Sequence, residues 1–238
     1  MDLKEMITKR RSFRKYTNEP VGEELLARIM AFAKSAKPLL PGIGVHMEVV
    51  TKEQVRFMLP WKTPQLIAIY SEPKEGYLEN AGFVLQQIDL YIQSLGLGSC
   101  WLGLGKMRMA NTPEGMEFVI LLAFGHSEES LRSGAGEFKR LSLTEIADRE
   151  DAALEPARLA PSSTNSQPWY FTHEGDRIHA YCSLKGLLRH KMLEYMNRID
   201  MGIAFAHLYL TNPETFYFSV EEAPQLPGYR YTGTVKLQ

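Results

Sequence analysis

The sequence predicts an α+β protein with two halves of similar organisation, in which central antiparallel or mixed sheets are flanked by helices. Two segments, residues 79–95 and 200–210, are apolar in the manner of core helices. Short runs of strand length lie before and after each of them. A polar stretch of small residues, 127–138, separates the two sets of elements and is the best candidate for a boundary.

The elements of the first half follow from periodicity. Apolar residues within 25–33 fall on one helical stripe, with acidic residues before it and a proline beyond its end. Residues 46–51 and 65–70 are apolar or β-branched and bounded by turn formers, which predicts strands. Residues 79–95 form the clearest helix, with a glycine after it as its cap. The apolar run 118–124 predicts a strand covered on both faces.

The second half repeats this alternation. The expected elements are a short helix at residues 148–159, a hairpin of strands at 170–173 and 177–182, a buried helix at 200–210, and closing strands at 215–221 and 229–235. Residues 80–84 and 200–204 place a polar residue, a glycine and apolar residues alike at the start of each core helix. This echo indicates either an internal repeat or a chance likeness between two buried helices.

Composition excludes several classes of function. The formal net charge is −1 and the 27 basic residues are spread along the chain, so no global field favours nucleic acid or an anionic membrane. The first residues are charged where a signal peptide is apolar, and no apolar run reaches the roughly 18 residues of a membrane span. We therefore expect a cytoplasmic protein. Cys100 and Cys182 lie in apolar surroundings, which favours buried thiols over a disulfide.

Residues 9–15 place five cations and the hydroxyl of Ser12 within seven positions. This could be a solvated basic face. However, guanidinium groups pair bidentately with phosphate oxygens and a serine adds a short donor, so the segment is also a candidate phosphate site.

Two further segments could bind a small molecule. Residues 160–169 concentrate hydroxyl and amide groups. This suits either a polar loop that joins a helix to a strand or a loop that binds a heterocycle and a polyol through hydrogen bonds. Residues 96–103 contain glycines that could cap the preceding helix or admit a flat ligand. They do not match a dinucleotide fingerprint, since Trp101 takes the place of its last glycine and the segment follows a helix.

Other chemistries have less support. His173, His179 and Cys182 would scatter over both faces of the proposed hairpin, so no metal site is expected. Motifs of hydrolases with a nucleophile elbow, zinc peptidases and P-loop proteins do not occur.

Together the three segments resemble the nitroreductase family of FMN enzymes. Its members share a basic R-R-S-x-R start, an A-P-S-S-x-N-x-Q-P-W loop and a helix ending G-L-G-S-C-W, and all three occur here nearly intact. Their order differs, because residues 36–42 stand where the family has the loop, and the loop arrives only at 160–169. In the family each FMN lies at a dimer interface, so the resemblance implies a fused pseudo-dimer that divides one site between its halves.

The implied division is a first half at residues 1–138 and a second at 139–238, with FMN between them. The resemblance assigns phosphate and pyrimidine contacts to the basic start, further phosphate charge to a K-R-x-x-L segment, ring and ribityl contacts to the serine-rich loop, and the reactive flavin edge to the glycine segment. The residues implied are Arg10, Arg11, Ser12, Arg14, Leu102, Gly103, Lys139, Arg140, Pro161, Ser162, Ser163, Asn165 and Gln167, the last as a support for the loop.

The resemblance implies an FMN-dependent oxidoreductase that takes hydride from NADH or NADPH and then reduces a nitroaromatic or quinone-like acceptor in a ping-pong cycle. Flavin carries the chemistry in such enzymes, so no catalytic acid or base is expected. A flavin-binding sensor or carrier without turnover and a scaffold that has lost flavin remain alternatives. A fused pseudo-dimer would be a monomer, with a small-molecule acceptor as its partner.

Overall fold

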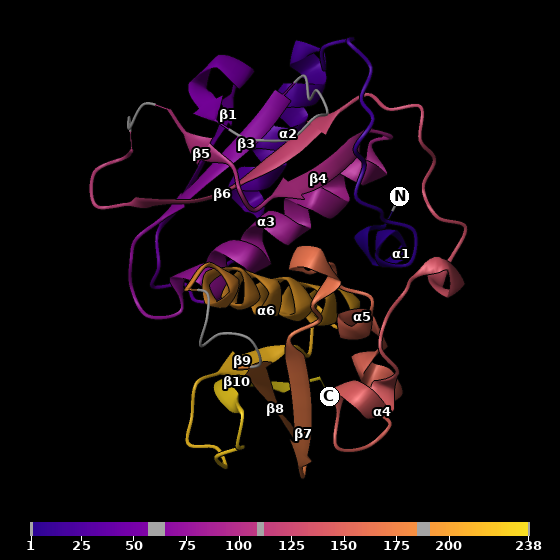
Figure 1. Cartoon of the computed structure of the whole chain (residues 1–238), viewed down its shortest axis with the longest axis vertical. Helices are drawn as coiled ribbons and strands as arrows, with labels where there is room; N and C mark the ends of the chain where they lie inside the picture. The colour runs from indigo at the N-terminus through magenta and orange to yellow at the C-terminus, as the bar shows by residue number, and fades with distance from the viewer. Residues whose placement is uncertain (1, 57–64, 109–111, 185–190, 238) are drawn as a thin grey trace.

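A computed structural model describes residues 2–56, 65–108, 112–184 and 191–237. Two four-stranded sheets lie at opposite ends of the molecule, and two long helices, α3 and α6, pass between them (Figure 1). Residues 126–142, the first part of the connection between the two sheets, run along one side of the molecule. The structure confirms the predicted α+β class.

The first sheet has the strand order β1-β3-β6-β4 and is antiparallel throughout. Its strands are β1 (Val45–Val50), β3 (Gln65–Ser71), β4 (Gly98–Leu102) and β6 (Glu117–Gly125). The central strand β6 is buried over its last seven residues, as expected of a strand covered on both faces. The sequence did not predict β4, because its glycines resemble a helix cap.

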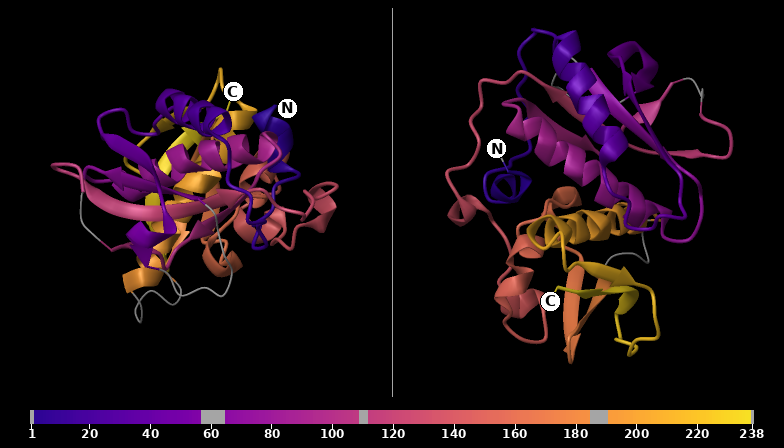
Figure 2. Two further views of the ribbon diagram at one scale, coloured as in Figure 1. Left: turned by 90° about the horizontal axis from the view of Figure 1, so that it is seen from above. Right: turned by 180° about the vertical axis from the view of Figure 1, so that it is seen from behind.

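Helices cover one face of the first sheet. The helix α2 (Glu23–Ser35) packs on α3 (Tyr77–Ser94), and both lie in front of the sheet when it is seen from behind (Figure 2). Gly96 follows α3 with φ +82°, the left-handed conformation expected of its cap. The short helix α1 (Leu3–Ile7) packs against α3 and α6 and leads into the basic segment.

The second sheet repeats the topology of the first. Its strands are β7 (Trp169–Glu174), β8 (Arg177–Ser183), β9 (Tyr217–Ser219) and β10 (Tyr229–Lys236), in the order β7-β8-β10-β9. In both sheets the strands stand first, second, fourth, third along the chain, and the long helix follows the second strand.

The two long helices pack at their glycines. The helix α6 (Lys191–Thr211) begins nine residues before the expected 200, because Lys191, Glu194 and Arg198 interrupt the apolar residues of its first turns. A Cβ atom on Gly202 would lie closer than 3.0 Å to the carbonyl oxygen of Glu79, and one on Gly82 equally close to that of Ile199. The two glycines that echo in sequence therefore meet at the same crossing, where their lack of a side chain lets the backbones touch.

Short elements complete the chain. They are the 3₁₀ turns η1 (Lys52–Gln54), η2 (Ala135–Glu137), η3 (Ala152–Leu154) and η4 (Ser163–Asn165), the helices α4 (Leu143–Ile146) and α5 (Glu155–Arg158), and the strand pair β2 (Val55–Arg56) and β5 (Lys106–Met107). The prediction of one helix over residues 148–159 was wrong in extent. Asp151 caps η3 and Pro156 stands in the first turn of α5, so the segment forms two short pieces.

Candidate functional site

The basic segment, defined here as residues 10–14, is tied to the first sheet and α3. The backbone N–H of Phe13 donates to the Ser99 carbonyl of β4 at 2.9 Å. Arg10 is almost completely buried, and its Nε donates to Asp89 Oδ2 on α3 at 3.0 Å. The Ser99 hydroxyl donates to the other oxygen of Asp89 at 2.6 Å. These contacts fix the segment's backbone, from which the Arg14 side chain extends into a cavity.

The serine loop, defined here as residues 161–167, leads into β7 of the second sheet and lines the same cavities as the basic segment. Three of its residues, Thr164, Asn165 and Gln167, have φ of +52°, +59° and +48°. Such left-handed backbone is costly outside glycine and clusters at functional sites. The N–H of Gln167 donates to Ser162 Oγ at 2.9 Å, which helps to hold this conformation.

A cavity of about 570 Å³, the anion cavity, lies between the basic segment and the serine loop. Six cations and one carboxylate line it: Arg10, Arg11, Arg14, Arg132, Lys139, Arg140 and Glu137. Arg10 and Arg11 form ion pairs with Asp89 and Glu129. The other four cations have no carboxylate partner within 4.0 Å among the residues that the structure describes. The cavity is therefore suited to an anion.

Burial, together with the charge of neighbouring cations, lowers the pKa of two of these arginines. Burial, with Arg10 nearby, lowers the pKa of Arg140 to about 10, and burial with Arg10 and Arg11 lowers the pKa of Arg132. Both guanidinium groups lie over the ring of Phe138, at 4.2 Å for Arg132 and 5.4 Å for Arg140. A bound anion would relieve their mutual repulsion.

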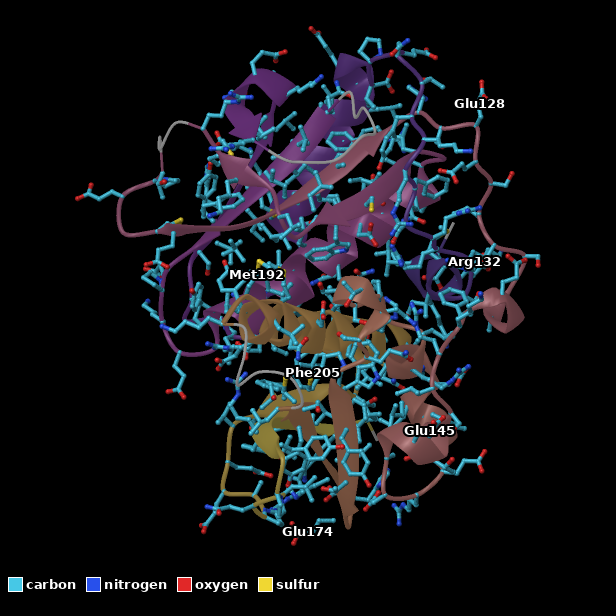
Figure 3. All side chains as sticks on the ribbon, in the orientation of Figure 1. Glu128, Arg132, Glu145, Glu174, Met192 and Phe205 are labelled. Carbon is cyan, nitrogen blue, oxygen red and sulfur yellow. The ribbon has the colours of Figure 1, made fainter. Side chains whose placement is uncertain are left out.

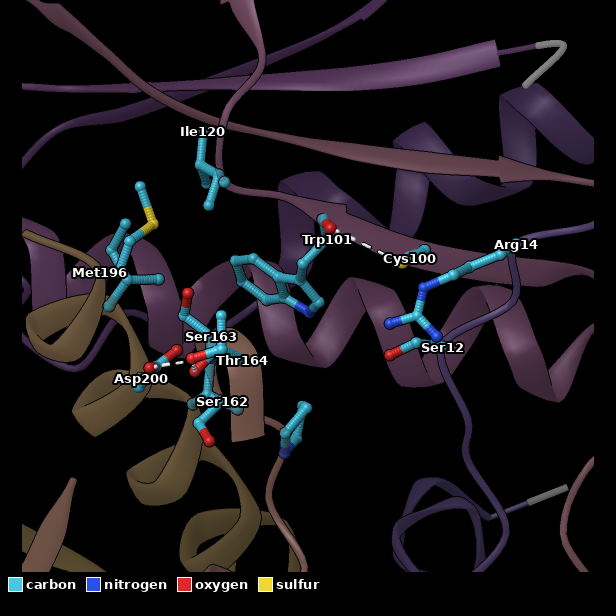
Figure 4. A pocket seen from close by; sticks show the side chains of 14 residues that line it. Ser12, Arg14, Cys100, Trp101, Ile120, Ser162, Ser163, Thr164, Met196 and Asp200 are labelled. Atoms are coloured by element: carbon cyan, nitrogen blue, oxygen red, sulfur yellow. Dashed lines mark hydrogen bonds between the residues drawn. The ribbon is translucent and has the colours of Figure 1, made fainter. Parts of the chain in front are cut away.

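The anion cavity adjoins two cavities on the side of β4 and α6. The inner cavity is bounded by Ser12 and Arg14 on one side and by Ser162 and Ser163 on the other, with Trp101 between them (Figure 4). The apolar cavity, of about 490 Å³, opens beside it. Its apolar lining is Trp101, Leu102, Leu104, Met192, Leu193 and Met196. Arg132 and Met192 mark the two ends of the whole site, on opposite sides of the molecule in the view of Figure 3.

Asp200 of α6 is the carboxylate of the inner cavity. Its side chain extends from α6 towards the serine loop, where Oδ2 accepts the N–H of Ser163 at 3.0 Å (Figure 4). It forms no ion pair with any residue in the described ranges. Burial raises the pKa of Asp200 to about 8, against the smaller opposing effect of the Ser163 N–H.

Comparison with known proteins now assigns the family. A protein-family model with the description "Putative TM nitroreductase" matches residues 2–212. The chain belongs to this nitroreductase family. A solved structure from Thermotoga maritima, described as a "putative nitroreductase", is 20% identical with a TM-score of 0.70, over 100% of this chain and 94% of that one.

Other nitroreductases match part of the chain. A nitroreductase family protein from Clostridium difficile 630 is 20% identical with a TM-score of 0.50, over 63% of this chain and 99% of that one. An FMN-dependent nitroreductase from Clostridium difficile R20291 is 20% identical with a TM-score of 0.45, over 60% of this chain and 96% of that one. No curated protein matches the sequence. The likeness to the Thermotoga maritima structure over the whole chain shows that the fold is that of the nitroreductases.

The structure brings the residues implied by the family motifs to one place. All of them line the three adjoining cavities except Gln167. Gln167 instead accepts the N–H of Leu141 at 2.8 Å and supports the loop. The Asn165 amide accepts from Arg140 at 2.5 Å and donates to the Lys139 carbonyl at 3.1 Å, so it joins the loop to the K-R segment.

Two residues of the site, Arg132 and Asp200, could not be assigned to it from the sequence. Arg132 lies in the polar stretch that was interpreted as a boundary, and nothing local distinguishes it from a solvated cation. Its Nη1 donates to the Arg10 carbonyl, which holds it at the anion cavity. Asp200 belongs to the sequence likeness between residues 80–84 and 200–204, but that likeness indicates an internal repeat and not a binding site.

The described residues show neither a metal site nor a membrane span. In the part of the chain that the structure describes, no group of three or more metal-ligating side chains is placed to hold an ion. Within the same ranges, no helix combines the length and apolarity needed to cross a bilayer. Cys100 and Cys182 are both free and buried, as predicted.

Proposed function

We propose that this nitroreductase relative binds one FMN across the three cavities and transfers hydride from NADH or NADPH to a nitroaromatic or quinone-like acceptor. The observation that carries the proposal is the meeting of three sequence segments, far apart in the chain, around one continuous site. FMN, when bound, would supply the hydride chemistry, both accepting hydride from the nicotinamide and passing it to the acceptor.

The donor set suits the parts of this cofactor. Four cations without carboxylate partners suit a phosphate dianion, and the hydroxyl and amide groups of the serine loop suit a polyol. Gly103 suits a flat ligand, since a Cβ atom there would lie 3.0 Å from Met196 Sδ and would narrow the cavity. The apolar cavity, with Leu104 and Met192 exposed at its edge, would admit the acceptor.

The proposal includes a division into halves at residues 1–138 and 139–238. The equal strand order of the two sheets and the paired glycines of α3 and α6 support it. A fused pair of this kind would be a monomer, because the helix contact that joins two subunits is already made within the chain. A cavity beside the start of α3 lies where the proposed symmetry of the halves would put a second FMN site. Its three cations are Lys74, Arg198 and Arg230, and each is paired with a glutamate, which supports a single FMN site.

The test is the visible spectrum of the protein after incubation with excess FMN and desalting. Retained flavin bands at about one FMN per chain support the proposal. Protein that stays colourless contradicts it. Rapid mixing with NADH or NADPH then shows whether the bound flavin is reduced, and a flavin that stays oxidised contradicts the oxidoreductase part alone.

Charge removal on one side of the site should weaken FMN binding. Arg14 lines all three cavities and has no carboxylate partner among the described residues. Arg14→Gln should raise the Kd of FMN by about 10- to 100-fold, the effect of losing one charge-assisted hydrogen bond. Equilibrium fluorescence titration measures it. Arg28→Gln, on the exposed face of α2, is the matched control and should leave the Kd unchanged.

A change in the other half should act on the same affinity. Asn165→Gly removes the side chain that holds Arg140 but keeps the left-handed backbone accessible. We expect a Kd for FMN raised by about tenfold, by the same titration. Unchanged affinity in both Arg14→Gln and Asn165→Gly would contradict a site divided between the halves.

A further inference from the structure

The two core helices clamp corresponding loops in the same way but with different chemistry. On α6, Asp200 Oδ2 accepts the N–H of Ser163 in the serine loop at 3.0 Å. On α3, Asn80 Oδ1 accepts the N–H of Leu40 at 2.9 Å, in the segment that stands where relatives carry that loop. Asn80 and Gly82 have the same spacing as Asp200 and Gly202. A neutral amide therefore suffices for the clamp, and the carboxyl of Asp200 needs another explanation.

The surroundings of Asp200 favour a neutral carboxyl. Its side chain is 4% exposed and lines the inner cavity. Arg14 of the basic segment and Cys100 of β4 line the same cavity, and Cys182 of β8 interacts electrostatically with Asp200. Glu79 of α3 and Arg198 of α6 form an ion pair with each other. Arg14 lies across the cavity, as Figure 4 shows, and Arg198 is held by Glu79 through bonds of 2.7 and 2.8 Å.

Neither thiol is ionised near neutral pH, so neither places a negative charge near Asp200. Burial raises the pKa of Cys182 to about 12 and also raises the pKa of Cys100. Asp200 accepts one backbone N–H and no other hydrogen bond from the described part of the chain. One oxygen of a buried carboxyl is thus left towards the cavity, and no described cation lies within 4.0 Å of the carboxyl to balance a charge.

We propose that Asp200 keeps a proton at the part of the site where a flat heterocycle binds. Its neutral carboxyl accepts the Ser163 N–H on one oxygen and donates an O–H to the heterocycle from the other. This inference rests on the proposed function, since it takes the ring of FMN as that heterocycle. Ionisation would leave a carboxylate without a counterion against the acceptor atoms of the ring, which opposes binding. The ring therefore binds the protonated form, and covering Asp200 raises its pKa further.

The experiment compares the pH dependence of FMN affinity in three proteins. The Kd of FMN is measured by fluorescence at about pH 6.5 and about pH 9.5 for the wild-type chain, Asp200→Asn and Glu214→Gln. Titration of the flavin itself changes all three Kd values equally and cancels in their ratios. Glu214 is exposed and lies outside the lining of the site, so its substitution controls for the removed charge.

We expect the wild type and Glu214→Gln to lose at least about tenfold more affinity than Asp200→Asn between the two pH values, since one proton is linked to binding. Infrared difference spectra of the protein before flavin is added should show a protonated carboxyl band that titrates in the wild type and is missing in Asp200→Asn. Parallel pH dependence in proteins that all bind FMN overturns the inference alone. Failure of all three to bind FMN at either pH overturns the proposed function.

Discussion

Gly202→Ala should cost the fold at least about 3 kcal/mol of unfolding free energy, because the new methyl group has no space at the crossing of α3 and α6. A Cβ atom there would overlap the backbone carbonyl of Glu79 and come within 3.0 Å of the Phe83 nitrogen. Both obstacles are backbone atoms of a buried helix, so no side-chain rotation can relieve them. The two helices would have to separate, which opens the core that both sheets share. Urea unfolding followed by circular dichroism measures the loss.

Two further substitutions sharpen this test. Gly82→Ala should be similarly destabilising, since its Cβ would overlap the Ile199 carbonyl from the other helix. Gly42→Ala is the matched control, because no atom of the described residues lies within 4 Å of its Cβ position and its φ is not in the left-handed region. It should leave the stability within about 0.5 kcal/mol of the wild type. Equal stability of all three variants would show that the helices do not depend on close backbone contact.

The predictable part of the fold is the part set by local pattern. The long apolar stripe of α3 and the continuous apolar run of β6 occur in the structure near their predicted bounds. The strand β4 was missed because pairing with β6 and the approach of Phe13 to Gly98 decide its conformation. Both are contacts between residues far apart in the chain, which a local pattern does not report. The start of α6 was missed because charged residues interrupt the apolar residues of its first turns, which are exposed or half-buried up to Tyr195.

The residues of the site also divide into those that the sequence identifies and those that only contacts between distant residues place there. Motif residues such as Arg14 and Ser162 could be named from sequence, because the family resemblance carries them onto matching positions. Arg132 could not, since its place depends on the Arg10 carbonyl and the ring of Phe138. The chemistry of Asp200 was also hidden. A single aspartate in an apolar helix shows neither which loop it will clamp nor that no described cation will lie within ion-pair distance of it.

Asp200→Asn should make the protein more stable at alkaline pH and have little effect in acid. An aspartate in the unfolded chain has a pKa of about 3.9, whereas burial raises the pKa of Asp200 in the folded protein to about 8. Between these values the folded protein keeps a proton that the unfolded chain has lost. The unfolding free energy of the wild type therefore falls as pH rises, by up to about 1.4 kcal/mol per pH unit, and levels off above about pH 8.

Asparagine stays neutral at every pH and can accept the Ser163 N–H as Asn80 accepts that of Leu40. The variant should thus equal the wild type near pH 4 and exceed it near pH 9 by several kcal/mol, on the order of 5 at most. Urea unfolding at about pH 5, 7 and 9, with Glu214→Gln as the control for charge, measures the divergence. A constant difference between the two proteins would mean that Asp200 is ionised throughout, and that a cation or water balances its charge in the cavity.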